Sequence, residues 1–219
     1  MTYFGFLARF LVIPLILMSI IFLYQRSRGV LLPAVFQTWP ARTVIFAHIV
    51  MAIVYTTPWD NYLVATSVWW YDPNLVTGYV IGWVPIEEYT FFVLQTILTG
   101  MWTVWLMTQV KIPKAADFTP NINIRWIATA IVAVGWFIST IFLIFGPPSA
   151  NYLTLIMSWA LVPVLIQFTF GADILWHYGR LILWALIPSS LYLGAADALA
   201  INAGTWTISP SQTVGIKFG

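Results

Sequence analysis

The sequence contains no cysteine and very little charge. The absence of cysteine excludes disulfide bonds, iron–sulfur clusters, thiolate zinc sites and catalytic thiols. Only 7% of the residues are charged, whereas about 25% is usual in soluble domains. A chain with so few charges cannot cover a water-facing surface, and 61% of its residues are apolar. We therefore expect an integral membrane protein.

Several kinds of chemistry are also excluded. Histidine occurs only at His48 and His177, too few for the histidine-rich di-iron sites of membrane desaturases. No expected helix has a central lysine for a retinal Schiff base. There is neither a G-x-G-x-x-G dinucleotide motif nor a paired Asp-rich motif for magnesium. The net charge of +2 is small and dispersed, which argues against nucleic acid. We expect no cofactor, no metal and no nucleic-acid partner.

Long apolar runs favour helices over the alternating strands of a membrane barrel. The first run is too long for a signal peptide and is interpreted as a retained helix. The sequence thus predicts an all-α polytopic membrane protein, with six transmembrane helices at roughly 4–24, 43–57, 79–107, 126–146, 151–171 and 180–200.

Basic residues alternate between the loops. The segments 25–42, 108–125 and 172–180 contain Lys or Arg, whereas 58–78 and 147–150 contain none. Basic loops favour the cytoplasmic side of a membrane. We therefore expect a multi-pass protein of a prokaryotic cell membrane with its N-terminus outside.

An internal repeat is visible at an offset of 137 residues. It pairs Asp60 with Asp197, Trp69 with Trp206, Pro73 with Pro210, Gly78 with Gly215 and Gly82 with Gly219. An offset of four helices preserves orientation, which predicts two parallel three-helix repeats. We expect the first repeat at 1–107, a linker helix region at 108–149 and the second repeat at 150–219.

The second repeat lacks a counterpart of Pro85, which would fall three positions after Gly219. We therefore expect the complete protein to have a seventh helix, or a second small subunit to supply one.

Two adjacent acids, Glu87 and Glu88, stand near the start of the third span. If that helix begins near 79, Glu87 lies about 12 Å along its axis. Acids at such depth are costly and usually functional. The alternative is that both carboxylates stabilise a helix N-terminus, with Pro85 in its first turn. Two adjacent acids are more than a helix cap requires, so we favour a functional role for them.

The two acids should differ in role because adjacent helical residues diverge by about 100°. Glu88 shares a stripe with Phe92, Gln95 and Thr99, while Glu87 shares its face with Phe91. We expect one acid to contact substrate and the other to orient that acid. The residue pattern leaves open which acid has which role.

Asp60 and Asp197 occupy matching places in the two repeats, Asp60 at the outer end of the second helix. Each either caps a turn or points towards an active-site cavity. Trp69 and Trp206 suit an interfacial belt, or the wall of a pocket that stabilises a carbocation. A lone intramembrane histidine such as His48 favours a hydrogen-bonded strut between helices.

The motifs together resemble the lycopene cyclase domain of two-subunit bacterial, fused archaeal and bifunctional fungal enzymes. The resemblance rests on Pro58-Trp59-Asp60-Asn61-Tyr62, Pro85-Ile86-Glu87-Glu88-Tyr89, Phe91-Phe92, Gln95-Thr96 and the segment 202–209. It is strongest over 58–105 and good over 187–215. Fused members of the family have a second P-x-E-E motif, which this chain lacks.

This resemblance implies a redox-neutral carotenoid cyclase that forms β-type rings by protonating an acyclic end such as that of lycopene. A carboxylic acid kept from water beside a second acid can hold the required proton. The candidate catalytic residues are Glu87, Glu88, Asp60 and Asp197. The candidate substrate contacts are Trp59, Trp69, Phe91, Phe92, Gln95 and Trp206. The expected partners are membrane lipid and the carotenoid.

Two other functions stay open at this point. In a transporter, Glu87 and Glu88 would form the ion site, but the fourth and fifth helices offer few polar residues to line a path. In a non-catalytic carotenoid-binding subunit, changing either Glu to Gln would leave the pigments unaltered.

Overall fold

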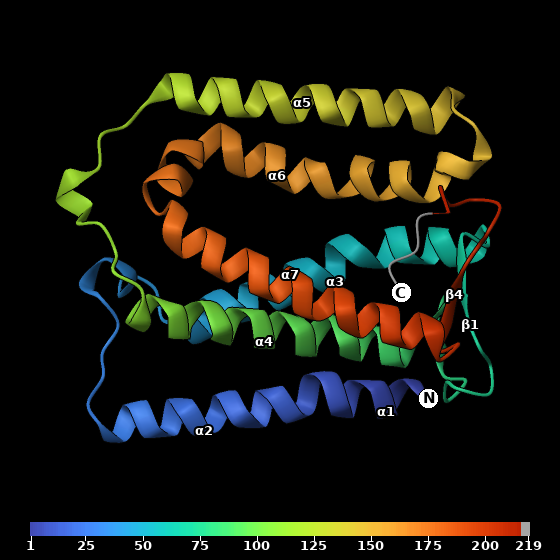
Figure 1. Ribbon diagram of the computed structural model, residues 1–219, viewed down its shortest axis with the longest axis horizontal. Coiled ribbons are helices and arrows are strands. Elements are labelled where there is room, and N and C mark those ends of the chain that lie inside the picture. The colour runs from blue at the N-terminus through green and yellow to red at the C-terminus, as the bar shows by residue number, and fades with distance from the viewer. Residues whose placement is uncertain (216–219) are drawn as a thin grey trace. The chain divides into compact units, whose positions relative to one another are not determined.

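The computed structural model describes residues 1–215, and Gly219, the predicted repeat partner of Gly82, lies outside them (Figure 1). Within this range, six helical spans are long and apolar enough to cross a membrane: Tyr3–Ser27, Ala41–Ala65, Ile86–Gln109, Ile122–Phe145, Pro148–His177 and Gly179–Asn202. The prediction of an all-α polytopic membrane fold is confirmed.

The first membrane-spanning segment contains α1 and α2, and each of the others contains one long helix, from α3 to α7. Their bounds are α1 Tyr3–Leu7, α2 Ile13–Ser27, α3 Ala41–Ala65, α4 Ile86–Gln109, α5 Ile122–Phe145, α6 Asn151–His177 and α7 Gly179–Asn202. A π-helical turn, η1 (Ala8–Val12), joins α1 to α2, and short 3₁₀ turns lie at η2 (Ala34–Phe36), η3 (Ala115–Asp117) and η4 (Pro148–Ala150). The strands are β1 Trp69–Tyr71, β2 Val80–Ile81, β3 Val84–Pro85 and β4 Trp206–Ile208.

The chain forms two compact units. The first contains Met1–Ile112 and Arg180–Thr207, and the second contains Pro113–Gly179 and the segment from Ile208. In the second unit α5 runs along α6 (Figure 1), and Arg125 pairs with Asp173 at 2.8 Å. These units follow packing, whereas the predicted domains follow the repeat, so the division into repeats stays a prediction.

The core of the first unit forms around the N-terminal helix. Tyr3, Phe6 and Leu11 are almost completely buried there, and they pack with Leu98 of α4 and Ala200 of α7. Large apolar side chains opposite small ones let three helices approach closely at this end of the unit.

The second span is longer than the predicted 43–57, because α3 continues through Pro58 to Ala65. Proline removes one backbone hydrogen bond, here the one to the Val54 carbonyl, and membrane helices tolerate this loss. Past the proline, the Asn61 amide donates to the Thr57 carbonyl at 2.9 Å. Asp60 therefore lies inside a helix and not in a turn after it.

The third span begins later than the predicted 79, because 80–85 form the hairpin of β2 and β3. Gly82 turns this hairpin with a φ of +69°, a conformation that strongly favours glycine. The Trp83 N–H then donates to Asn61 Oδ1 at 2.7 Å. Since α4 starts at Ile86, Glu87 and Glu88 lie in its first turn and not eight residues inside it.

The loop predicted at 172–180 is also shorter. Helix α6 reaches His177 and α7 starts at Gly179, so Arg180 lies in the first turn of α7. The α6 backbone departs from helical angles at Gly171, where the predicted span ends.

The ends of α3 and α7 share one geometry at the repeat offset. In α3 the Val68 N–H donates to the Leu63 carbonyl at 2.9 Å, and in α7 the Thr205 N–H donates to Ala200 at 3.0 Å. The intervening residues Ser67 and Gly204 both have positive φ, 56° and 69°. Each end leads directly into a strand, β1 and β4, and these strands pair with each other.

Candidate active site

The Glu88 carboxylate is the centre of a polar cluster at one end of the first unit. It accepts hydrogen bonds from the hydroxyls of Tyr3 in α1 and Tyr71 in β1, the latter at 3.0 Å. Among the described residues, no side chain caps the N-terminus of α4. Glu88 thus lies where a capping acid would lie, yet its hydrogen bonds join three separate segments of the fold.

Tyr71 acts as a stable donor to this carboxylate. Its burial, and then the negative charges of Glu88 and Asp60, raise the pKa of Tyr71 well above its ordinary value. The hydroxyl therefore keeps its proton where a free tyrosine would begin to ionise.

Two further acids face the same cluster. Asp60 is 1% exposed. Asp60 and Asp197 each lie close enough to Glu88 for the charges to interact. The Trp206 indole N–H donates to Asp197 at 3.1 Å. Three carboxyl groups from α3, α4 and α7 therefore share one small region.

Aromatic rings surround these acids. The Tyr3 ring lies 5.1 Å from Trp206 and stacks on Tyr71 at 6.0 Å. Phe6 contacts Trp206 edge-on at 5.1 Å and lies 6.4 Å from Phe91. Such a shell keeps water away and offers negatively polarised ring faces to a cation.

Trp59 and Trp69 form a second aromatic pair. Their rings meet edge-to-face at 5.4 Å. Trp69 follows Asp60 by nine residues, as Trp206 follows Asp197. The same acid–tryptophan spacing therefore occurs in both predicted repeats.

Glu87 has different surroundings from its neighbour. It is fully buried, and its Oε1 accepts the Thr77 N–H at 2.6 Å, while Oε2 has no hydrogen-bond partner in the described part of the chain. Glu87 therefore fixes the loop between β1 and β2.

The remaining candidates lie further along α4. Phe92 is buried against Tyr89 and Val84, one helical turn beyond Glu88. Gln95 is half-buried, and its backbone carbonyl accepts the Thr99 hydroxyl at 2.8 Å. The structure thus brings Glu88, Asp60, Asp197, Trp69, Trp206 and Phe91 together. Phe92 and Gln95 follow Glu88 along α4 at spacings of 4 and 7 residues.

Sequence reasoning missed Tyr3 and Tyr71. Neither belongs to a matched motif, and Tyr3 lies 85 positions from Glu88. The available signal was weak: a tyrosine at the start of an apolar helix and another beside Trp69 and Trp70.

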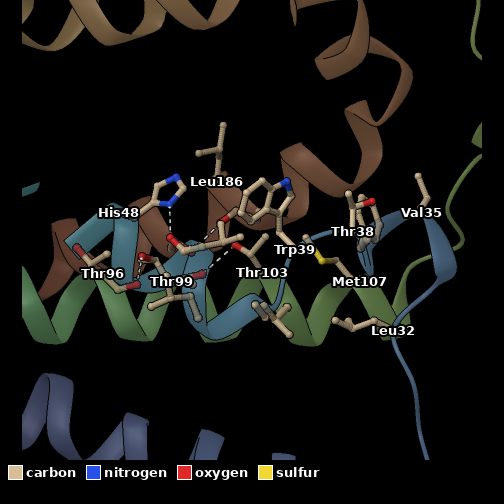
Figure 2. Close-up of a pocket in the computed structure, with 18 of the residues that line it drawn as sticks. Leu32, Val35, Thr38, Trp39, His48, Thr96, Thr99, Thr103, Met107 and Leu186 are labelled. Carbon is tan, nitrogen blue, oxygen red and sulfur yellow. Dashed lines mark hydrogen bonds between the residues drawn. The ribbon is translucent and has the colours of Figure 1, made fainter. Parts of the chain in front are cut away.

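A pocket of about 650 Å³ lies in the same unit, between α3, α4, α7 and the segment before α3. Figure 2 shows Thr96, Thr99, Thr103 and Met107 following one another along α4, with His48, Trp39 and Leu186 around them. The His48 Nδ1 lies 2.7 Å from the Val44 carbonyl of its own helix, so this ring nitrogen bonds within α3, and a strut between helices stays a prediction.

Comparisons with known proteins point to one family. Lycopene beta-cyclases from two strains of Halobacterium salinarum are 36% identical over 170 residues, which cover 76% of this chain and 67% of each relative. The bifunctional lycopene cyclase/phytoene synthase of Aspergillus oryzae is 30% identical over 189 residues, which cover 82% of this chain and 31% of that protein. No family model matches the chain. No solved structure matches it either.

The archaeal matches extend over two thirds of each relative. The chain also has helices long and apolar enough to cross a membrane, as its sequence predicts. The chain therefore belongs to the lycopene cyclase family, and its interpretation as an enzyme of this family is confirmed.

Proposed function

We propose that the protein closes β-type rings at the acyclic ends of a linear carotenoid such as lycopene, within the membrane. The observation that carries this proposal is the Glu88 carboxyl, held by two tyrosine hydroxyls beside two more acids and an aromatic wall.

The reaction needs one proton to enter and one to leave. The proton adds to the terminal double bond and leaves a tertiary cation. A neighbouring double bond attacks this cation, which forms the carbon–carbon bond of a six-membered ring. The new ring cation then loses a proton to give the ring double bond. Atoms and electrons balance without an oxidant or reductant.

We assign proton delivery to Glu88. Like charges at short range oppose simultaneous ionisation, so at least one of the three clustered carboxyls keeps its proton. The two tyrosine donors fix the Glu88 carboxyl in place, and a fixed acid within an apolar wall suits protonation of a hydrocarbon.

We assign proton removal to Asp197. The Trp206 N–H donates to Asp197 Oδ1 at 3.1 Å and holds this carboxyl in one orientation. Asp60 supplies a third carboxyl whose charge offsets the developing cation. Because the acceptor and the donor share one cluster, the proton can return to Glu88 after each turnover.

The aromatic residues protect the intermediate. The faces of Tyr3, Phe6 and Trp206 attract positive charge without forming a bond to it. Their bulk excludes water, which would otherwise trap the cation as an alcohol.

The proposal includes the membrane arrangement. The N-terminus and the acid cluster would lie at the outer side of a prokaryotic cell membrane, with the basic loops in the cytoplasm. The shared geometry at the ends of α3 and α7 supports a parallel repeat of the cyclase unit.

Expression in a lycopene-accumulating bacterium tests the function. We expect pigments with β-type rings from the protein encoded by the complete gene, and unchanged lycopene from its Glu88→Gln variant at equal membrane abundance. Unchanged lycopene with the wild-type protein in the membrane would contradict the proposal.

A further inference from the structure

We propose that the pocket between α3, α4 and α7 binds the polyene chain distal to the reacting end and so selects substrates by length. This inference rests on the proposed cyclase function. The pocket is separate from the acid cluster, and its proposed occupant is a long hydrocarbon.

The pocket shares one face of α7 with an acid. Leu186, Ser190 and Leu193 line it, and they precede Asp197 by 11, 7 and 4 residues. These spacings place all four positions on one side of a helix. The near edge of the pocket thus lies one turn, about 6 Å along the axis, from Asp197.

The same relationship holds along α4. The lining residues Thr96, Thr99 and Thr103 follow Glu88 by 8, 11 and 15 positions, which is again one helical stripe. The last lining residue of α4 is Met107, about 28 Å along the axis from Glu88. This length approaches the hydrocarbon thickness of a bilayer, about 30 Å, and therefore suits a long polyene.

The pocket chemistry favours a hydrocarbon despite its many hydroxyls. Thr96 donates to the Phe92 carbonyl at 2.7 Å, Thr103 donates to Thr99 at 2.8 Å, and Ser189 donates to Ala185 at 2.6 Å. These three hydroxyls therefore donate within their own helices. What remains for a ligand is mainly methyl and methylene surface, which gains from contact with a polyene.

The size and ends of the pocket indicate how it would select length. Its volume of about 650 Å³ lies within the usual range for a ligand site. Leu32, Val35 and Met107 lie at the opposite end of the pocket from His48 and Thr96 (Figure 2), and Thr96 is the lining residue of α4 nearest to Glu88 in the sequence. When one end of the substrate lies at Glu88, its chain would extend past Thr103 towards these residues.

Filling the pocket tests this site. Thr103→Trp and Ser189→Trp introduce bulk from two different helices, so a folding defect in one leaves the other informative. Leu191→Trp is the matched control, because Leu191 lies two positions from Ser189 in α7 but is 70% exposed and does not line the pocket. Each variant is assayed in membranes with lycopene and with a truncated polyene that carries the same acyclic end.

We expect both pocket variants to lower the ratio of long-substrate to short-substrate turnover by about tenfold, a typical effect of overpacking. The control should preserve the wild-type ratio. An unchanged ratio in both pocket variants would overturn the inference and leave a lipid chain as the occupant. Absence of wild-type turnover on either substrate would instead contradict the cyclase function itself.

Discussion

The Tyr71 hydroxyl lies 3.0 Å from a Glu88 carboxylate oxygen, and the two residues belong to different elements of the fold. Strand β1 contributes little to the core, but it carries this hydroxyl to the first turn of α4. The position of the proposed acid therefore depends on a short strand as well as on the long helices.

Tyr71→Phe should slow cyclisation. The ring and its stacking on Tyr3 are kept, while Glu88 loses one donor. A hydrogen bond to the carboxylate that forms as Glu88 releases its proton contributes about 1.5–3 kcal/mol, so the rate should fall about tenfold to a hundredfold. Initial rates in membranes measure this effect. Tyr79→Phe, whose residue is 76% exposed, is the control. Equal rates in both variants would show that Tyr71 is dispensable.

Glu88→Gln and Glu87→Gln should have unequal effects. Gln at 88 keeps the size of the side chain but cannot deliver a proton, so cyclisation should stop. At 87, an amide oxygen can still accept the Thr77 N–H, so much of the activity should survive. Pigment analysis at matched membrane abundance separates the two. If Glu87→Gln is inactive and Glu88→Gln is active, the assignment of the two acids is reversed.

Asp197→Ala and Trp206→Phe should be coupled. Each change removes one partner of the hydrogen bond between these residues, so the double variant should be little worse than Asp197→Ala alone. The two single effects and the double effect on rate form a complete cycle. Trp83→Phe serves as the control, since Trp83 is 66% exposed. Additive effects would mean that Trp206 acts independently of Asp197.

Gly82→Ala should destabilise the hairpin before α4. The φ of +69° disfavours alanine, and its Cβ would meet Asn61 Oδ1 at 2.1 Å. We expect a loss of about 1–3 kcal/mol in unfolding free energy. Gly78→Ala is a close match, because Gly78 has a φ of +82° but open space around it. Thermal unfolding in detergent should show a smaller shift for Gly78→Ala. Equal shifts would remove the role given to Asn61.

Hydropathy was sufficient to predict the helical fold, because a lipid environment leaves few alternatives for a long apolar segment. The ends of the helices needed information that hydropathy lacks. Pro58 suggested an end to α3, yet the helix continues to Ala65. Tyr79 to Pro85 are apolar enough to extend α4, yet Gly82 turns them into a hairpin.

The acids of the candidate site were predictable because charge is rare in this sequence. Their tyrosine partners were not, because Tyr3 reaches Glu88 through tertiary packing that local patterns do not encode. The unequal surroundings of Glu87 and Glu88 likewise depend on the backbone of Thr77, and a backbone donor leaves no trace in residue identity.

The pairing of β1 with β4 has a mechanical consequence. Each strand begins nine residues after an acid, Asp60 or Asp197, and the Asp72 N–H bonds the Thr205 carbonyl at 3.3 Å to extend the connection. A displacement of α7 away from α3 would have to break backbone hydrogen bonds before it separated the two carboxyls. The spacing of the acids is therefore clamped by main chain, and side-chain substitutions around them should alter reactivity sooner than geometry.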